Sequence, residues 1–312
     1  MISTTDSLQL SYIKETEAGV TPTSPALKKL RNTGESFAYA ITKKQSEEID
    51  GLGNVKDLIP VSAQASGGFN FELSYGTYDD IFESVMGGAW AADVLKNGQT
   101  VKPLTFEKRF FTGISNDEET YAYLRYRGMV GNTMSLEFAS NEIIKGSCDF
   151  LGRSSEVGTS IIASATYIPP TSAQVLSAAS HMGTLTFGSF ASPKLLSASL
   201  EMNHNTKGAG VIGSTDFADI QYGEFSLTGT LAAYFEDADM YNAYLESTSL
   251  GLSITVGSGS GSKYKFEIPA LKLSDCQIVA GSKNDFLVAN MPFQALYSPS
   301  DACTLIITRA VA

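Results

Sequence analysis

The 312-residue sequence has few of the side chains that most often carry catalysis or bind metals. Its three cysteines, Cys148, Cys276 and Cys303, are scattered and form no CxxC pair, which excludes a disulfide framework or a zinc knuckle; we expect three buried thiols. Its two histidines, His181 and His204, lack the spacing of metal ligands, and we expect both to be exposed. No GxSxG motif supports a nucleophilic serine. The sequence therefore predicts no catalytic, cofactor-binding or metal-binding residue, no cofactor and no enzyme activity.

Basic side chains and long hydrophobic runs are also scarce. Lys and Arg number 22 against 33 Asp and Glu, a formal net charge of −11, which argues against a protein that wraps nucleic acid with a basic face. No run reaches the ~18 apolar residues of a membrane-spanning helix. The first residues lack the basic and apolar regions of a signal peptide, so we expect a chain that stays in the cytoplasm. With 43% apolar residues, a packed core is expected.

Two further patterns resemble functional motifs and fail on detail. The sequence GSGSGSK at residues 257–263 lacks the adjacent Gly-Lys of a phosphate loop and precedes a strand, so it predicts a hairpin tip. The acidic clusters at 117–119 and 236–239 lack the DxDxDG spacing of a calcium loop. We expect the first to be a solvated turn and the second a helix cap.

The dominant period of the sequence is two. Apolar and polar residues alternate at 69–75, 225–231 and 264–268, which predicts strands with one buried and one wet face, typical of antiparallel sheets. Clusters of Gly, Asn, Asp and Ser separate the strands. Two stretches, 78–86 and 237–246, instead have acidic residues early and apolar residues on one face, which predicts short amphipathic helices. The protein is expected to be mostly β.

These elements recur in the same order. A strand at 37–41, a polar loop at 43–56, a strand at 69–75 and the first helix are matched by a strand at 196–202, a loop at 203–218, a strand at 225–233 and the second helix. The sequence therefore predicts two tandem antiparallel β-sandwich or β-barrel domains, each with one short flanking helix. The expected bounds are an N-terminal arm at 1–34, a first domain at 35–155, a linker or bridging strands at 156–189, a second domain at 190–298 and a C-terminal strand or arm at 299–312.

The first half has one segment without a counterpart in the second. Residues 87–102 follow the first helix and contain the only tryptophan, Trp90, whereas the second helix passes almost directly into a strand at 250–256. This segment either fills a groove between subunits or packs as an ordinary surface loop.

Several ordered stretches resemble the bacteriophage tail tube (major tail) protein family. They are GVTP (19–22), LRNTGES (30–36), GGFNFELSY (67–75), YLRYRGM (123–129), GSCDFLG (146–152), and GTL (229–231) with Tyr234, Phe235 and Tyr241. Each is a structural motif and weak alone. Their order along most of the chain carries the resemblance.

The resemblance implies a structural virion protein whose stacked rings form the tail tube and the channel for DNA ejection. If one chain holds two tube domains, a homotrimer would close a ring of pseudo-sixfold symmetry, which we favour over a homohexamer. An acidic lumen would let genomic DNA slide without specific binding. The other implied partners are the tape measure, tail tip and terminator proteins, with no membrane. The implied location is the virion tail of a siphophage without a sheath, after assembly in the host bacterial cytoplasm.

A non-viral β-sandwich module that binds a ligand or carbohydrate is the alternative. It predicts an exposed aromatic platform and a monomer in solution, whereas a tube protein forms rings or polymers.

Overall fold

The computed structural model describes residues 4, 7–49, 54–115, 118–190, 193–283 and 285–311. Two helices and twenty-one strands lie within this part of the chain. The helices are α1 (Asp79–Met86) and α2 (Asp239–Leu245). The strands are β1 (Gln9–Lys14), β2 (Ala26–Lys29), β3 (Gly34–Glu35), β4 (Ala38–Gln45), β5 (Leu58–Glu72), β6 (Val94–Lys96), β7 (Leu104–Ser115), β8 (Glu118–Ala139), β9 (Lys145–Gly152), β10 (Ser154–Gly158), β11 (Thr166–Ile168), β12 (Met182–Phe187), β13 (Leu195–Asn203), β14 (Lys207–Ala209), β15 (Asp219–Gln221), β16 (Ser226–Tyr234), β17 (Leu250–Gly257), β18 (Lys263–Leu273), β19 (Gln277–Val279), β20 (Val288–Ala295) and β21 (Ile306–Thr308).

The mostly β fold and its two short helices are confirmed. Buried and solvated side chains alternate along β9, β18 and β20, as the period of two predicts. Both helices lie within the predicted ranges and have acidic first turns. Large antiparallel sheets dominate, and the described strands do not close into a barrel.

Two long strands each contribute to both layers of a β-sandwich. The first part of β8, up to Met129, pairs with β7 and β10, and its last part pairs with β9 and β13. In the second half, β18 pairs with β17 along most of its length, with β21 at Lys265–Glu267 and with β20 at its end. Each half of the chain therefore has one strand that bends from one layer into the other.

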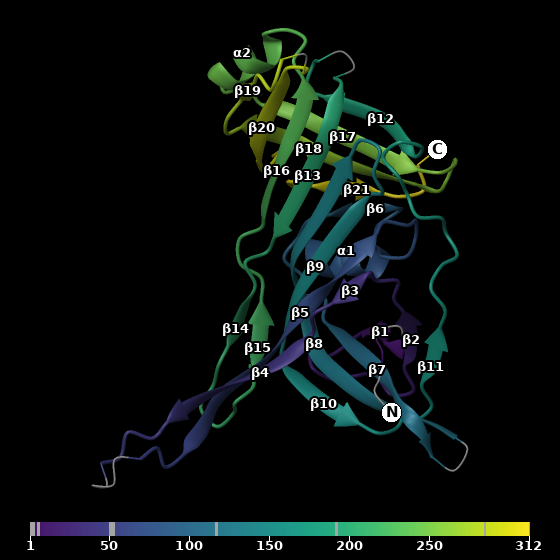
Figure 1. Ribbon diagram of the computed structural model, residues 1–312, viewed down its shortest axis with the longest axis vertical. Coiled ribbons are helices and arrows are strands. Elements are labelled where there is room, and N and C mark those ends of the chain that lie inside the picture. Colours follow the sequence, from purple (N-terminus) through teal and green to yellow (C-terminus); the bar gives the residue numbers. More distant parts are fainter. Residues whose placement is uncertain are drawn as a thin grey trace.

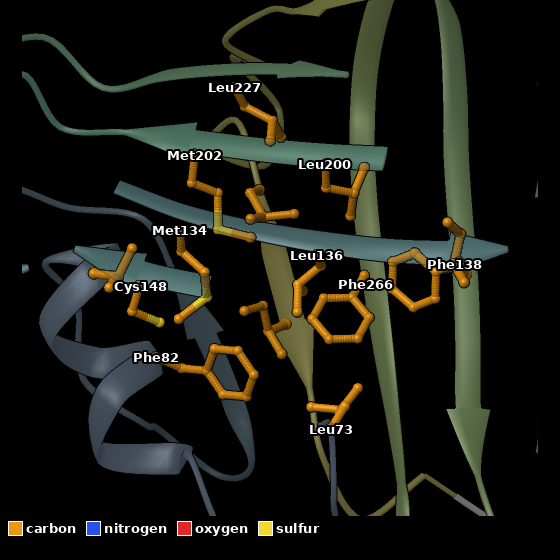
Figure 2. Close-up of a cluster of buried hydrophobic side chains, with 14 of the residues drawn as sticks. Leu73, Phe82, Met134, Leu136, Phe138, Cys148, Leu200, Met202, Leu227 and Phe266 are labelled. Carbon is orange, nitrogen blue, oxygen red and sulfur yellow. The ribbon is translucent and has the colours of Figure 1, made fainter. Parts of the chain in front are cut away.

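The pairing of β8 with β13 continues one sheet from the first half into the second (Figure 1). Beneath this join, side chains of both halves form one hydrophobic cluster. Figure 2 shows Phe82 of α1, Met134 and Leu136 of β8, and Phe266 of β18 gathered in this cluster. The two halves thus share a core rather than touching at a polar interface.

The two expected polar loops are partly strands. Because β4 runs to Gln45 and β5 begins at Leu58, the first loop starts later than residue 43 and the second strand starts well before Phe69. In the second half, β14 and β15 form a separate two-stranded ribbon within residues 203–218 and just beyond. The ribbon and the β4–β5 hairpin project from the body on the same side (Figure 1).

The segment at 87–102 contacts the second half of its own chain. It contains β6, which pairs with the C-terminal strand β21, and β21 in turn pairs with β18. Arg309 stacks its guanidinium 4.6 Å from the Trp90 ring centre and forms ion pairs with Asp79 (2.6 Å) and Asp93 (2.8 Å). The chain end therefore fastens the second half to the first.

Candidate assembly surfaces

The strands of the two halves pair in the same pattern. In the first half the antiparallel pairs are β4–β5, β5–β9, β9–β8, β8–β7, β7–β1 and β8–β10. In the second half they are β13–β16, β16–β20, β20–β18, β18–β17, β17–β12 and β18–β21. Six strand pairings of the first half therefore have a counterpart in the second half. The paired strands follow one another along the chain in the same order in both halves, with additional strands between some of them.

Local irregularities recur at matching places as well. Between Leu104↔Met129 and Phe106↔Tyr126, β8 carries one extra residue, and between Leu250↔Leu271 and Leu252↔Ile268, β18 carries one extra residue. A matching position on β18 is therefore 142 residues after its counterpart on β8, as in Tyr126 and Ile268.

A side-chain hydrogen bond also repeats. The backbone N–H of Gly68 donates to Ser36 Oγ at 3.0 Å, and that of Thr230 donates to Ser199 Oγ at 3.0 Å. Ser36 and Ser199 each precede a buried apolar residue, Phe37 and Leu200. Positions on β13 are therefore 163 residues after their counterparts beside β4.

One sheet runs through both halves in the order β4, β5, β9, β8, β13, β16, β20, β19, and we call it the crossing sheet. It has two open edges among the described strands. β4 pairs with β5 alone, and β19 pairs with β20 alone. Inside the chain the equivalent edges are joined, since β13 pairs with β8 and Leu200 faces Leu136. The spacings of 163 and 142 make Phe37 and Ile278 the counterparts of that facing pair. Leu136 is fully buried, whereas Ile278 is 39% exposed.

Side chains cover the open edge at Phe37. Its carbonyl oxygen accepts hydrogen bonds from Lys108 Nζ and Tyr126 Oη, both at 3.1 Å, and its N–H donates to Glu35 at 3.0 Å. Lys108 also forms a 2.9 Å ion pair with Glu35. Lys108 and Tyr126 are far from Glu35 and Phe37 in sequence, and sequence reasoning did not find these residues as a cluster.

The face of the crossing sheet that is turned away from the core is polar. Its strands β5, β9, β8, β13, β16 and β20 present mainly hydroxyl and amide groups there, and Ser135 and Ser147 hydrogen-bond across two of them at 2.8 Å. The charged side chains that these strands and the end of β18 place on this face are four carboxylates, on Glu72, Glu137, Asp149 and Glu201, and two ammonium groups, on Lys145 and Lys272. The surface is therefore hydrophilic and weakly acidic.

A shallow groove of about 430 Å³ lies on this face, around Asn70, Ser135 and Ser147. The aromatic residue in its lining is Phe71, whose side chain is 1% exposed. The groove therefore offers no aromatic platform of the kind that the carbohydrate-binding alternative predicts.

The two projecting hairpins carry exposed aliphatic side chains. On the β4–β5 hairpin, Ile41 is 50% exposed and Leu58 55%, and at the tip of the β14–β15 ribbon Ile212 is fully exposed. The hairpins contact each other, because the N–H of Ala63 donates to Thr215 O at 2.8 Å. Exposed apolar side chains on these projecting arms are candidates for contact with another protein surface.

The expectation that His204 is exposed is wrong. Its side chain is fully buried at the base of the β14–β15 ribbon, with its ring 4.0 Å from the Tyr222 ring centre and 4.9 Å from that of Phe225. Burial lowers the pKa of His204, so the ring is neutral near pH 7. A polar loop in sequence gave no sign of this, because the two aromatic residues come from beyond the ribbon. His181 is half-buried, and its Nδ1 accepts the N–H of Ser177 at 3.0 Å.

The other singled-out residues have structural settings. Cys148, Cys276 and Cys303 are buried and free, as predicted, and the pKa of each thiol is raised by burial. Residues 257–263 form the tip between β17 and β18. Asp237 accepts the N–H of Asp239 just before α2, but the N-cap residue is Ala238 and no side chain caps the helix, so the acidic residues complement the first turn without forming the expected cap.

Asp117 of the first acidic cluster lies outside the described residues. Within the described ranges, no group of three His, Cys, Asp or Glu side chains is placed to hold a metal ion, and no helix is long and apolar enough to cross a membrane.

A β-rich chain with matched halves, open sheet edges and projecting apolar hairpins has the features of a subunit in a protein polymer. The sequence matches the phage tail tube protein family over residues 5–295, and the chain belongs to this family. The resemblance found in the sequence is therefore confirmed. A comparison with curated proteins gives no match.

Proposed function

We propose that this structural tail protein forms rings by repeating, between copies, the join that links its own two halves. The observation that carries the proposal is the β8–β13 pairing, because its counterparts are the two open edges at β4 and β19. Residues around Phe37 of one copy would pair with residues around Ile278 of the next. Three copies would then give six similar units, a homotrimer with pseudo-sixfold symmetry; a homohexamer is the alternative.

We further propose that the two halves arose by duplication, with repeats at about 9–158 and 182–308. These bounds are wider than 35–155 and 190–298, because β1 and β12 open the repeats with matching partners and β10 and β21 close them. Residues 159–181 are then the linker, and β11 in it pairs in parallel with β2 of the first repeat.

The polar face of the crossing sheet is the proposed lining of the channel. The opposite face is packed in the core, so a ring built edge to edge leaves this one to face the lumen. Four carboxylates against two lysines per chain leave this face acidic, and an acidic face repels phosphate groups, which supports passage of genomic DNA without specific binding. The exposed aliphatic side chains of the two hairpins support stacking of one ring on the next.

Family membership supports the remaining assignments, which we propose as follows. The protein acts as a structural component and not as an enzyme, is assembled in the host bacterial cytoplasm, and resides in the tail of a siphophage without a sheath. Its partners beyond other copies are the tape measure protein in the lumen and the tail tip and terminator proteins at the ends.

Electron microscopy of the concentrated purified protein tests the proposal. End-on views with three chains around a pseudo-sixfold channel are expected. Six chains per ring would keep the tube and overturn the trimer. A monomer at every concentration, also in the presence of a tail-tip complex that nucleates assembly, would overturn the function and favour the binding module.

A further inference from the structure

The two helices occupy matching places but differ in what covers them. In α1, Ile81, Ser84 and Val85 are buried against the first half, and in α2 the residues buried or half-buried at the same spacing are Met240, Ala243 and Tyr244. This match, 159 residues apart, makes Tyr241 the counterpart of Phe82 and Leu245 the counterpart of Met86.

The matched side chains have opposite exposures. Phe82 and Met86 are fully buried, whereas Tyr241 is 38% exposed and Leu245 is 62% exposed. The two residues of each pair are four positions apart and lie on one side of the helix. α2 therefore keeps an apolar stripe uncovered where α1 has the same stripe covered.

The cover on α1 comes from the second half of the chain. The Phe82 ring centre lies 5.6 Å from that of Tyr264 and 6.2 Å from that of Phe266, and both contacts are edge-to-face. Tyr264 and Phe266 belong to β18. A helix of one repeat thus packs on the strand of the next repeat, beside the β8–β13 join.

The first half has the matching strand surface, which is less covered within the described part of the chain. The 142-residue spacing makes Ala122 and Leu124 of β8 the counterparts of Tyr264 and Phe266. Phe110 of β7 pairs with Ala122 and takes the place of Val256. Val256 and Tyr264 are fully buried, whereas Phe110, Ala122 and Leu124 are only half-buried.

We infer that the Tyr241–Leu245 stripe of α2 docks on the Phe110–Ala122–Leu124 surface of a second copy of this chain. This inference rests on the proposed ring, and it specifies the side chains that hold neighbouring copies together. We assign a second copy to this surface because the same contact already exists inside the chain. There α1 packs on β18 beside the β8–β13 pairing, and α2 and β8 are the counterparts of these two elements.

The joint between copies is smaller than the joint inside the chain. Inside the chain, β6 extends from the end of α1 and pairs with β21, and Arg309 packs on Trp90. After α2 the chain enters β17 within a few residues, so no second β6 exists to meet β10 of the neighbour. The helix stripe therefore contributes a larger share of the contact between copies.

The test uses charge exchange across the proposed contact. Tyr241→Asp should raise the protein concentration needed for half-maximal assembly about tenfold or more, because an apolar anchor is replaced by a carboxylate. Leu124→Lys should have a similar effect. The double variant should recover a large part of the assembly, since the introduced carboxylate of one copy would then face the introduced ammonium group of the next. Asn242→Asp is the control, with the same charge on the adjacent position of the same helix.

Assembly is followed by light scattering and electron microscopy, and the fold of each variant by circular dichroism and thermal denaturation. Normal assembly of Tyr241→Asp, equal loss in Asn242→Asp, or no recovery in a folded double variant would each overturn the docking. If one of these outcomes overturns the docking while wild-type protein still forms tubes, the proposed function stands. If wild-type protein forms no ring even with a tail-tip complex, the proposed function itself fails.

Discussion

Removal of the Phe82 ring tests whether the two halves depend on each other for stability. Phe82 is fully buried, and its ring makes edge-to-face contacts with Tyr264 and Phe266 of the other half. A buried Phe→Ala change costs about 3–5 kcal/mol from lost burial and the cavity left behind. Because two aromatic contacts are lost as well, each about 0.5–1.5 kcal/mol, we expect Phe82→Ala to fall in the upper part of that range.

Urea denaturation measures this loss, and the chain contains its own probe. Trp90 is the only tryptophan, and its Nε1 donates to the backbone oxygen of Asp79 in α1 at 3.1 Å, so its fluorescence reports on this helix. Tyr241→Ala on α2 is the matched control and should cost less than about 1 kcal/mol in the monomer. Phe82→Leu provides a milder change if Phe82→Ala does not fold. Equal stabilities of Phe82→Ala and wild type, or equal losses at Phe82 and Tyr241, would refute the reasoning.

Three further changes probe the buried polar contacts. Glu107→Ala removes the carboxylate 2.7 Å from the buried guanidinium of Arg125 and leaves that group the Ser160 carbonyl and the 3.6 Å contact with Glu156, so thermal denaturation should show a loss of up to about 3–5 kcal/mol; a loss below about 1 kcal/mol would contradict a structural role for the pair. Arg309→Ala removes partly exposed ion pairs and the contact with Trp90, so we expect a loss of only about 1 kcal/mol but faster proteolysis of the C-terminal strand, which unchanged cleavage would exclude. Because burial lowers the pKa of His204, the unfolded chain takes up the proton first and stability falls as the pH drops below about 6.5; His204→Phe should therefore gain stability relative to wild type between about pH 7.5 and 5.5, and a constant difference would contradict the buried neutral ring.

Local patterns were enough to predict the elements of this fold. The helix at 79–86 shows its acidic first turn and apolar face within eight residues, and β18 shows its alternation within a few residues of Tyr264. The similar order of helix and strands in the two halves was visible in the sequence because these elements recur at similar spacing. The helix and the strand alternation depend on residues that are close together in the sequence, so they can be predicted from the sequence alone.

The missed features depend on partners that are distant in sequence. His204 is buried by Tyr222 and Phe225 only because the ribbon brings residues 204 and 222 back together. β6 and β21 are three residues each and exist because they pair across more than 200 positions. Likewise, alternation at Phe37 shows two faces of a strand but not which edge of that strand stays open.

The open edge at Phe37 poses a problem that the second half does not have. An unpaired edge is a template for uncontrolled pairing, and here Glu35, Lys108 and Tyr126 occupy its N–H and carbonyl groups. At the joined edge inside the chain, the counterparts of these three residues are apolar: Ala198, Ile254 and Ile268. The polar set thus occurs at the edge that we propose to pair with another copy, and is absent where the edge is already paired inside the chain.

This contrast predicts the effect of making the first edge resemble the second. Glu35→Ala with Lys108→Ile removes both members of the 2.9 Å ion pair together, so no unpaired buried charge remains. The Phe37 N–H and one of its carbonyl hydrogen bonds then lose their partners, and a neighbouring strand can supply new ones. We expect a folded variant that assembles with a shorter lag and at lower concentration than wild type in light scattering. Slower assembly of a folded double variant would show that Glu35 and Lys108 belong to the joint between copies instead of shielding the edge before the joint forms.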